Sequence, residues 1–161
     1  LATTTFNAAF FAGLEDVEHH PHSFYISRYP EGREATVAWG VKDLRFRNDS
    51  ANGVLVTTSY TDGSVTVRIW GTKRYRIEAT KSARLRERPF ETVHDRRQPG
   101  TRPGDCVPQE GVPGFQVNVT RLFFQGGRQV RDEQFHTAYQ PEDRIICGST
   151  GPNEGADRPT D

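Results

Sequence analysis

Hydrophobic and polar residues alternate along this chain in a way that predicts one short helix followed by many strands. In residues 3–12, Phe6 and Phe10 stand four positions apart and so share a helical face, and Gly13 is suited to end the helix in a left-handed conformation. After the helix, aromatic and β-branched residues gather in short runs between turn-forming residues, which predicts strands at 23–29, 35–39, 44–46, 54–60 and 64–70.

Two hairpins stand out in this pattern. Asp62-Gly63 separates residues 54–60 from 64–70, where Val65, Val67 and Ile69 alternate with polar or aromatic neighbours. Gly126-Gly127 separates predicted strands at 115–124 and 129–139, and a further strand is expected at 144–147. The predicted fold class is α+β, mostly antiparallel β, with a short N-terminal helix packed on a β-sheet and followed by a small elongated all-β module.

A change in composition predicts how the chain divides. Residues 81–105 are charged and proline-bearing, so we place a boundary near Tyr75 and an extended linker-like stretch around residues 99–104. Residues 149–161 contain almost nothing to bury and are expected to be disordered. The expected divisions are residues 1–74, 75–148 and the tail 149–161.

Charge and hydropathy exclude two classes of partner. The chain of 161 residues has 21 basic and 21 acidic residues, so it lacks the excess positive charge typical of nucleic-acid binding. Its longest apolar run, residues 8–12, is far shorter than the roughly 18–20 residues that cross a bilayer. The chain opens with Leu1 and no leader, so we expect any export signal or anchor to lie upstream.

The two cysteines, Cys106 and Cys147, lie in segments that read as extended. A disulfide between them is the preferred interpretation, and it would indicate an oxidising, extracytoplasmic location. The alternative is two unrelated buried thiols, while the absence of CxxC spacing argues against a metal or redox role.

Four sequence blocks carry a family resemblance. Residues 2–10 (ATTTFNAAF), 20–23 (HPHS), 29–37 (YPEGREATV) and 43–48 (DLRFRN), with a closing VRIWG at 67–71, resemble the C-terminal half of the VanW domain. Residues 108–115 (PQEGVPGF), with 92–95 and 144–146 around them, resemble the G-five module, an elongated β domain that often follows VanW domains. The chain departs from the family in two respects: Glu34 stands where the family usually has Asp, and the glycine-rich segment that normally precedes the first block is absent.

The resemblance implies an exported or membrane-tethered protein of the bacterial cell envelope. Some family members occur in vancomycin-resistance clusters, and some are suspected of cutting or binding the wall glycan. The resemblance therefore implies peptidoglycan, or another cell-wall glycan, as the partner, and it implies no cofactor.

The cluster His19-His20-Pro21-His22-Ser23 is the first candidate for chemistry. Because His20 precedes proline it is biased toward extended backbone, where residues two apart face the same side, so the rings of His20 and His22 are expected to lie together. Glu18 is placed to orient a ring. The competing interpretation is that these rings form hydrogen bonds with the backbone at a helix-to-strand junction. A zinc site needs at least a third protein ligand, and the sequence offers none at a suitable spacing, so zinc is not predicted.

Carboxylates and aromatic rings complete the predicted site. A lytic glycosidase can work with one carboxylic acid, so the candidate catalytic residues are Glu18, His20, His22 and Glu34, unless the carboxylates only pair with nearby arginines. The candidate substrate-binding residues are Asn7, Ser23, Tyr25 and Asp43. Tyr29 and Trp39 could also line a sugar groove, although core packing competes for every ring.

Three function hypotheses follow from these residues. The first is an envelope module that binds or helps to remodel peptidoglycan, linked to glycopeptide resistance. The second is a peptidoglycan-cleaving lytic glycosidase that uses Glu18 or Glu34 with His20 or His22. The third is an interaction module for another envelope protein.

Overall fold

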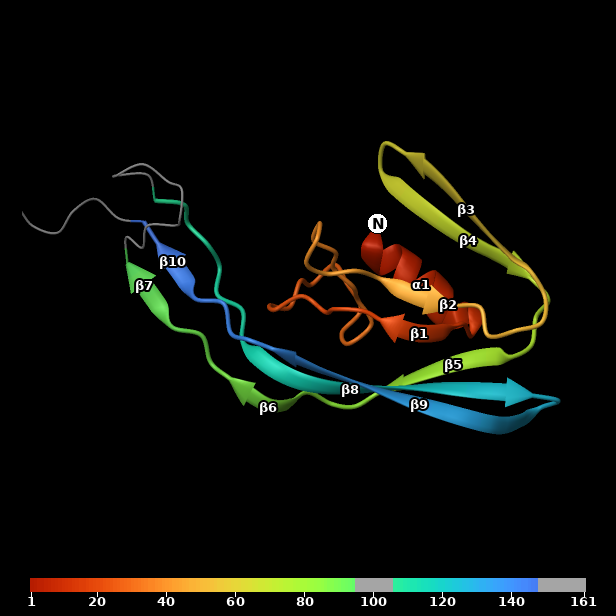
Figure 1. Cartoon of the computed structure of the whole chain (residues 1–161). Helices are drawn as coiled ribbons and strands as arrows, with labels where there is room; N and C mark the ends of the chain where they lie inside the picture. Colours follow the sequence, from red (N-terminus) through yellow and green to blue (C-terminus); the bar gives the residue numbers. More distant parts are fainter. Residues whose placement is uncertain (95–105, 148–161) are drawn as a thin grey trace, which may run out of the picture.

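The computed structural model describes residues 1–94 and 106–147 (Figure 1). The stretch at 99–104 that was expected to be extended and the tail at 149–161 that was expected to be disordered lie outside the described residues. The elements follow in the order α1 (Ala2–Ala12), β1 (Glu15–Glu18), β2 (Arg45–Arg47), β3 (Val54–Thr61), β4 (Ser64–Gly71), β5 (Arg76–Lys81), β6 (Leu85–Arg88), β7 (Thr92–His94), β8 (Gly114–Gln125), β9 (Arg128–Tyr139) and β10 (Arg144–Ile146). One short helix and mostly antiparallel strands confirm the predicted α+β class.

Helix α1 forms where the spacing of its phenylalanines predicts it. Phe6 and Phe10 are both buried, and their rings meet edge to face with centroids 5.9 Å apart. Gly13 ends the helix in a left-handed conformation with φ 72°, and its N–H donates to the carbonyl of Phe10. The absence of a Cβ makes this conformation inexpensive for glycine, so the helix stops where the sequence predicts.

Strand β8 is the centre of the main sheet. It pairs with β9 along one edge, while β5 and then β6 pair with the other edge, all antiparallel. From Phe115 to Phe124 its odd-numbered residues are buried and its even-numbered residues are partly exposed, because successive side chains of a strand point to opposite faces. The sheet therefore has one face that can be covered, and α1 lies along it (Figure 1).

The core joins the two predicted divisions of the chain. Phe6, Phe10 and Ala35 pack with Val119 of β8, and partly buried residues of β5 and β9 surround them: Ile77, Ala79 and Phe135. The predicted boundary near residue 75 thus crosses a shared core, and the helix buries its apolar face against strands that follow that boundary.

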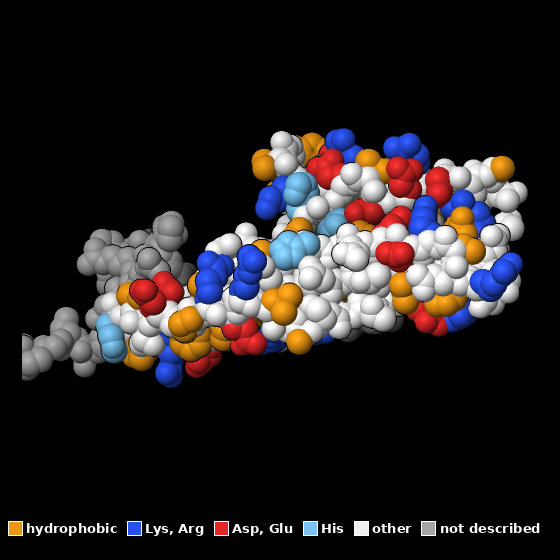
Figure 2. Space-filling model, turned by 90° about the horizontal axis from the view of Figure 1, so that it is seen from below, with side chains coloured by type: hydrophobic (Ala, Val, Ile, Leu, Met, Phe, Trp, Pro, Cys, Tyr) orange, Lys and Arg blue, Asp and Glu red, His pale blue; other side chains and the backbone are white. Residues whose placement is uncertain are grey.

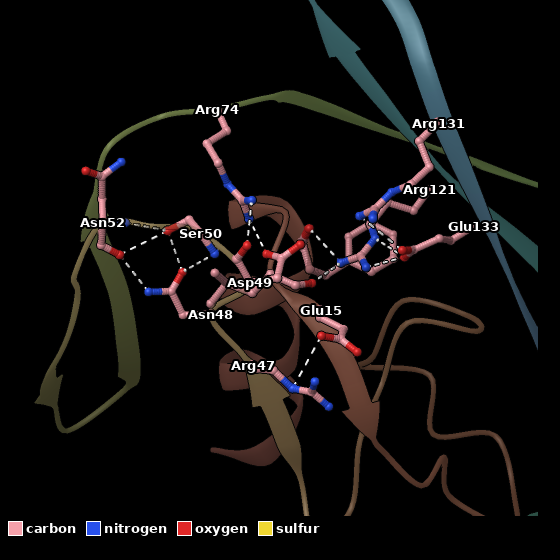
Figure 3. Close-up of polar contacts among 12 residues, drawn as sticks. Glu15, Arg47, Asn48, Asp49, Ser50, Asn52, Arg74, Arg121, Arg131 and Glu133 are labelled. Atoms are coloured by element: carbon pink, nitrogen blue, oxygen red, sulfur yellow. Dashed lines mark hydrogen bonds and ion pairs between the residues drawn. The ribbon is translucent and has the colours of Figure 1, made fainter.

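One buried cation links the helix to the sheet. Arg121 of β8 is only 1% exposed, and its guanidinium donates to the carbonyls of Phe10 and Leu14 at 3.2 and 3.1 Å. Arg121 also pairs with Glu133 of β9, which forms a second ion pair with Arg131, two residues earlier in the same strand (Figure 3). A buried charge is tolerated when it is paired and hydrogen-bonded, and here the same side chain satisfies carbonyls at the C-terminal end of α1.

The β3–β4 hairpin forms as predicted, with Thr61 opposite Ser64 at its tight turn. It lies on the side of α1 away from the main sheet (Figure 1). Many of its apolar side chains are exposed, including Leu55 at 61%, Tyr60 at 85% and Trp70 at 56%. Among the described residues, β3 and β4 are the only strands of this sheet.

Two expected strands are wrong. Residues 23–29 form turns, in which Tyr29 N–H donates to the carbonyl of Ile26, because Tyr25 packs edge to face on Phe115 and Tyr139 and so holds the segment as a loop. Residues 35–39 contain only an isolated bridge from Ala38 to Lys42. Strands β1, β5, β6 and β7 were not predicted.

The end of the molecule that lies beyond β6 and the start of β8 contains a single pair of short strands (Figure 1). Parallel strands β7 and β10 pair there, and the Cys106–Cys147 disulfide closes beside them with its Cα atoms 5.7 Å apart. The predicted disulfide is confirmed. Because Cys106 precedes β8 and Cys147 follows β10, the loop that the bridge closes contains the whole β8–β9 hairpin.

Candidate functional site

A loop from Pro30 to Ala35 carries the charged residues of the candidate site, and the sheet fixes its position. Gly32 has φ 69°, and its N–H donates to the hydroxyl of Tyr139 at 2.9 Å. A Cβ at Gly32 would lie 2.8 Å from Cγ2 of Val119, so only glycine lets the loop approach β8 this closely.

Helix α1 holds the other side of this loop. The hydroxyl of Thr3 donates to the carbonyl of Ala35 at 3.0 Å and accepts from its N–H at 3.3 Å. The side-chain amide of Asn7 donates to the carbonyls of Thr3 and Arg33, both at 2.8 Å. The side-chain amide of Asn7, a predicted substrate-binding residue, thus bonds once within α1 and once to the loop, so it helps to anchor the loop.

His22 and Glu34 form the central pair of the site. Nδ1 of His22 lies 2.8 Å from Oε2 of Glu34, whose side chain is fully buried, whereas the side chain of His22 is 24% exposed. The ring of His22 stacks on Tyr29 with centroids 5.3 Å apart. Oε1 of Glu34 is buried and has no hydrogen-bond partner among the described residues.

Tyr139 lies close to Glu34. Burial raises the pKa of its hydroxyl, and the neighbouring carboxylate of Glu34 raises the pKa further, against the lowering effect of the Gly32 N–H. The hydroxyl therefore stays protonated at neutral pH. It is positioned as a neutral support for the loop beside a buried carboxylate.

The other two histidines have carboxylate partners of their own. His20 bonds Glu18 at 2.9 Å, and His19 bonds Asp16 at 2.6 Å while stacking on Phe6 at 4.5 Å. The hydrogen bond from His20 holds the pKa of Glu18 below 4.5, with Arg45 adding to the effect. The lowered pKa favours the ionised form of Glu18. A general acid near neutral pH needs a raised pKa, so Glu18 is poorly suited to that role.

The pairing with Glu34 fixes the imidazole of His22 in one orientation. A buried carboxylate that accepts from Nδ1–H fixes the ring orientation and leaves Nε2 as the acceptor nitrogen. Glu34 is sealed below the ring, so it can reach a ligand only through His22. The pair can therefore exchange a proton at a partly exposed imidazole.

Among the described residues, no hydrogen bond or ring contact joins the side chains of the remaining predicted residues to His22. Ser23 is exposed and its carbonyl accepts from the N–H of Gln140 at 2.7 Å. Tyr25 is half-buried in the cluster with Phe115 and Tyr139, and exposed Asp43 pairs with Arg45 at 2.6 Å. Within residues 1–94 and 106–147, no group of three or more His, Cys, Asp or Glu side chains is arranged to hold a metal ion.

Sequence reasoning missed two contributors to this region. Tyr139 ends the predicted strand at 129–139, but nothing local connects it to Gly32, which is 107 positions away. Arg33 is one of the nearby arginines that the sequence offered only as ion-pair partners for the carboxylates, although its guanidinium lies over Phe11 at 4.9 Å. Its position directly before Glu34 was the available signal.

Comparison with known proteins locates a relationship in the first part of the chain. Residues 1–70 match the family described as VanW like protein. The chain is also 34% identical over 70 residues to the uncharacterized protein YoaR of Bacillus subtilis (strain 168), a match that covers 44% of this chain and 23% of that protein. No solved structure gives a significant match.

The surface and the helix content bear on possible surroundings. Basic and acidic side chains are interspersed on the face shown in Figure 2, in keeping with the formal net charge of zero. Within the described residues, no helix has the length and apolarity needed to span a bilayer.

Proposed function

We propose, because residues 1–70 match the family described as VanW like protein, that this chain is part of an extracytoplasmic cell-envelope protein that binds or helps to remodel peptidoglycan. The family match is the observation that carries the proposal, and a link to glycopeptide resistance comes with the family resemblance alone. The chain spans less than a quarter of the length of its curated relative, so these properties are proposed for the protein to which this chain contributes.

The disulfide supports the proposed location. Disulfide bonds persist in exported proteins and are rare in reducing compartments. The Cys106–Cys147 bridge is therefore the feature of this chain that best fits a site outside the cytoplasmic membrane.

Exposed aromatic surface supports glycan binding. Trp39 is fully exposed at the tip of the turn from Ala38 to Lys42, with exposed Val37 and Val41 beside it. A large amphipathic ring such as an indole can cover the apolar face of a sugar while its N–H reaches a hydroxyl. Burying this exposed surface against glycan would supply part of the binding free energy.

Co-sedimentation with purified cell walls tests the binding function. We expect the chain to pellet with walls, and Trp39→Ala to weaken binding by about fivefold or more, since burying a large side chain is worth roughly 1.5–3 kcal/mol. Trp70→Ala is the matched control, because Trp70 is also exposed but donates to Thr57 within the β3–β4 hairpin. Failure of the wild-type chain to pellet would refute the proposal.

A lytic glycosidase is the second candidate, and the His22–Glu34 pair is the observation that favours it. In this version His22 transfers the proton and the buried Glu34 holds the ring, a division of roles that sequence reasoning did not assign. Release of soluble, reducing-end-blocked fragments from purified walls tests it. His22→Gln and Glu34→Gln should both abolish release, whereas His20→Gln should not, since His20 is bonded to the separate carboxylate Glu18. Wall binding without soluble fragments would leave only the binding function.

A further inference from the structure

A cavity of about 590 Å³ opens between the C-terminal end of α1, the Pro30–Ala35 loop and strand β5. Apolar atoms from helix, loop and sheet form much of its wall. Charged groups from the loop and from β5 complete it, and its lining residues are Phe11, Pro30, Glu31, Arg33, Glu78, Ala79, Thr80, Lys81 and Val119.

The charged groups of the cavity differ in whether they have partners. Glu31 accepts from both Lys81 and Arg84, and Glu78 pairs with Arg76. Glu31 is thus shared by two cations. Arg33 forms no ion pair with any described residue, whereas both carboxylates of the lining are already paired with other cations, so the charge of Arg33 has no carboxylate partner.

Arg33 is also held in place. Its carbonyl accepts from Asn7, its N–H donates to the carbonyl of Pro30, and its guanidinium lies over the rings of Phe11 and Phe10 at 4.9 and 5.8 Å. Burial lowers the pKa of Arg33, which reflects partial removal of the cation from water. A stacked, partly desolvated guanidinium keeps its N–H fork available and loses little side-chain entropy when it binds a ligand.

We infer that this cavity binds a carboxylate group, with Arg33 donating both arms of its fork and an apolar substituent of the ligand packing on Phe11 and Val119. A planar carboxylate matches one guanidinium in bidentate geometry. The carboxylates of Glu31 and Glu78 at the wall disfavour a more highly charged phosphate. The apolar wall suits a small aliphatic side chain next to the bound carboxylate.

A peptide terminus is the ligand class that combines these features, and its assignment to wall peptides rests on the proposed function. Arg33 directly precedes Glu34, so one loop carries both the carboxylate anchor and the His22–Glu34 pair. A wall peptide anchored at Arg33 would give the region a way to recognise the peptide part of peptidoglycan as well as its glycan.

Titrations of the full chain followed by NMR test this inference. The probes are N-acetyl-alanyl-alanine with a free carboxylate, the same dipeptide as its C-terminal amide, and inorganic phosphate. We expect the acid to bind at least tenfold more tightly than the amide and phosphate to bind more weakly than the acid. Equal binding of acid and amide, or tighter binding of phosphate, would overturn the carboxylate assignment.

Three variants locate the effect. Arg33→Gln should reduce affinity for the acid by about tenfold, to the level of the amide, and Arg33→Lys should fall between, because it keeps the charge and loses the fork. Arg28→Gln is the control, since Arg28 is exposed and lies over Tyr29 outside the cavity. Retained chemical-shift dispersion shows that each variant is folded. An unchanged affinity in both Arg33 variants would reject the site.

The same samples separate this inference from the proposed function. If the wild-type chain sediments with walls but does not bind the dipeptide acid, the cavity assignment is wrong and wall binding stands. If it binds the acid but does not sediment, the cavity assignment stands and the proposed function is wrong.

Discussion

Two hairpins in the described part of this chain form by the same local pattern and have very different surroundings. Hairpins β3–β4 and β8–β9 are both antiparallel, and each turns at a glycine-containing dipeptide. In β8, Phe115, Val117 and Phe123 are at most 1% exposed, whereas in β3 Leu55 and Tyr60 are 61% and 85% exposed. Local sequence determines that a hairpin forms. How much the hairpin stabilises the molecule depends on how far other elements bury its apolar side chains.

This difference explains where the candidate site lies. The loop with Arg33 and Glu34 rests on β8 and β9 through Gly32 and Tyr139, so it inherits the rigidity of the covered hairpin. A site needs groups held by packed neighbours, and β3–β4 has fewer of them.

The strongest test of the comparison removes one aromatic ring from each hairpin. Phe123→Ala should lower the free energy of unfolding by about 3–5 kcal/mol, because the ring is fully buried and contacts Tyr75, Arg121 and Arg131. Tyr60→Ala should change it by less than about 0.5 kcal/mol, since a substitution at an exposed site removes few contacts. Urea unfolding followed by circular dichroism measures both, and similar losses would show that β3–β4 is covered in solution.

The disulfide constrains the part of the chain that contains the buried β8–β9 hairpin and leaves β3–β4 outside the closed loop. The Cys106–Cys147 bridge closes a loop that contains β8–β9 and excludes β3–β4. The double variant Cys106→Ser, Cys147→Ser should lower the free energy of unfolding by about 2–4 kcal/mol, mainly through the added entropy of the unfolded chain. Thiol titration of denatured, unreduced wild-type protein should find no free thiol, and two free thiols would contradict the bridge.

Sequence reasoning predicted the elements whose signals are local. Helix α1 has its phenylalanine spacing and Gly13, and both hairpins have alternation and a tight turn, so each is encoded within a few neighbouring residues. Residues 23–29 carry strand-forming residues too, but Tyr25 gains more by packing on Phe115 and Tyr139 than by joining a ladder. Tertiary packing overrode propensity there.

The candidate site was predictable only in part. His22 and Glu34 were both proposed, yet their pairing joins residues 12 apart through a fold that sequence alone did not specify. The polar strand β5, Arg76–Lys81, lacks a hydrophobic run and becomes a strand because β8 offers it an edge. For the same reason the Arg33 cavity, which β5 helps to form, had no local signal.

A pair of glycine substitutions measures how closely the loop approaches the covered hairpin. Gly32→Ala should cost about 2–3 kcal/mol, since it combines a left-handed backbone with a Cβ that meets Val119. Gly127→Ala, at the β8–β9 turn, has φ 80° but open space around it, so it should cost only about 1 kcal/mol. The difference between the two measured losses isolates the steric contact, and equal losses would mean that the loop does not pack on β8.

The smallest expected effect compares one ion-pair cluster beside each hairpin. Although partial burial raises the pKa of Glu31, hydrogen bonds from Lys81 and Arg84 lower it below 4.5 overall, and Arg74 lowers the pKa of Asp49 at the base of β3–β4 (Figure 3). A carboxylate whose pKa is lower in the folded than in the unfolded state stabilises the fold when the pH is above the unfolded pKa. This contribution disappears as the pH falls through the folded pKa. Glu31→Gln should therefore lower the free energy of unfolding by less than about 1 kcal/mol at pH 7, and the difference from wild type should shrink on acidification and vanish below the lowered pKa of folded Glu31. Asp49→Asn should lose less, because its partner is a single arginine and its side chain is 28% exposed against 12% for Glu31. Urea unfolding at a series of pH values measures both losses, and a larger loss in Asp49→Asn would place the more strongly coupled charges beside the exposed hairpin.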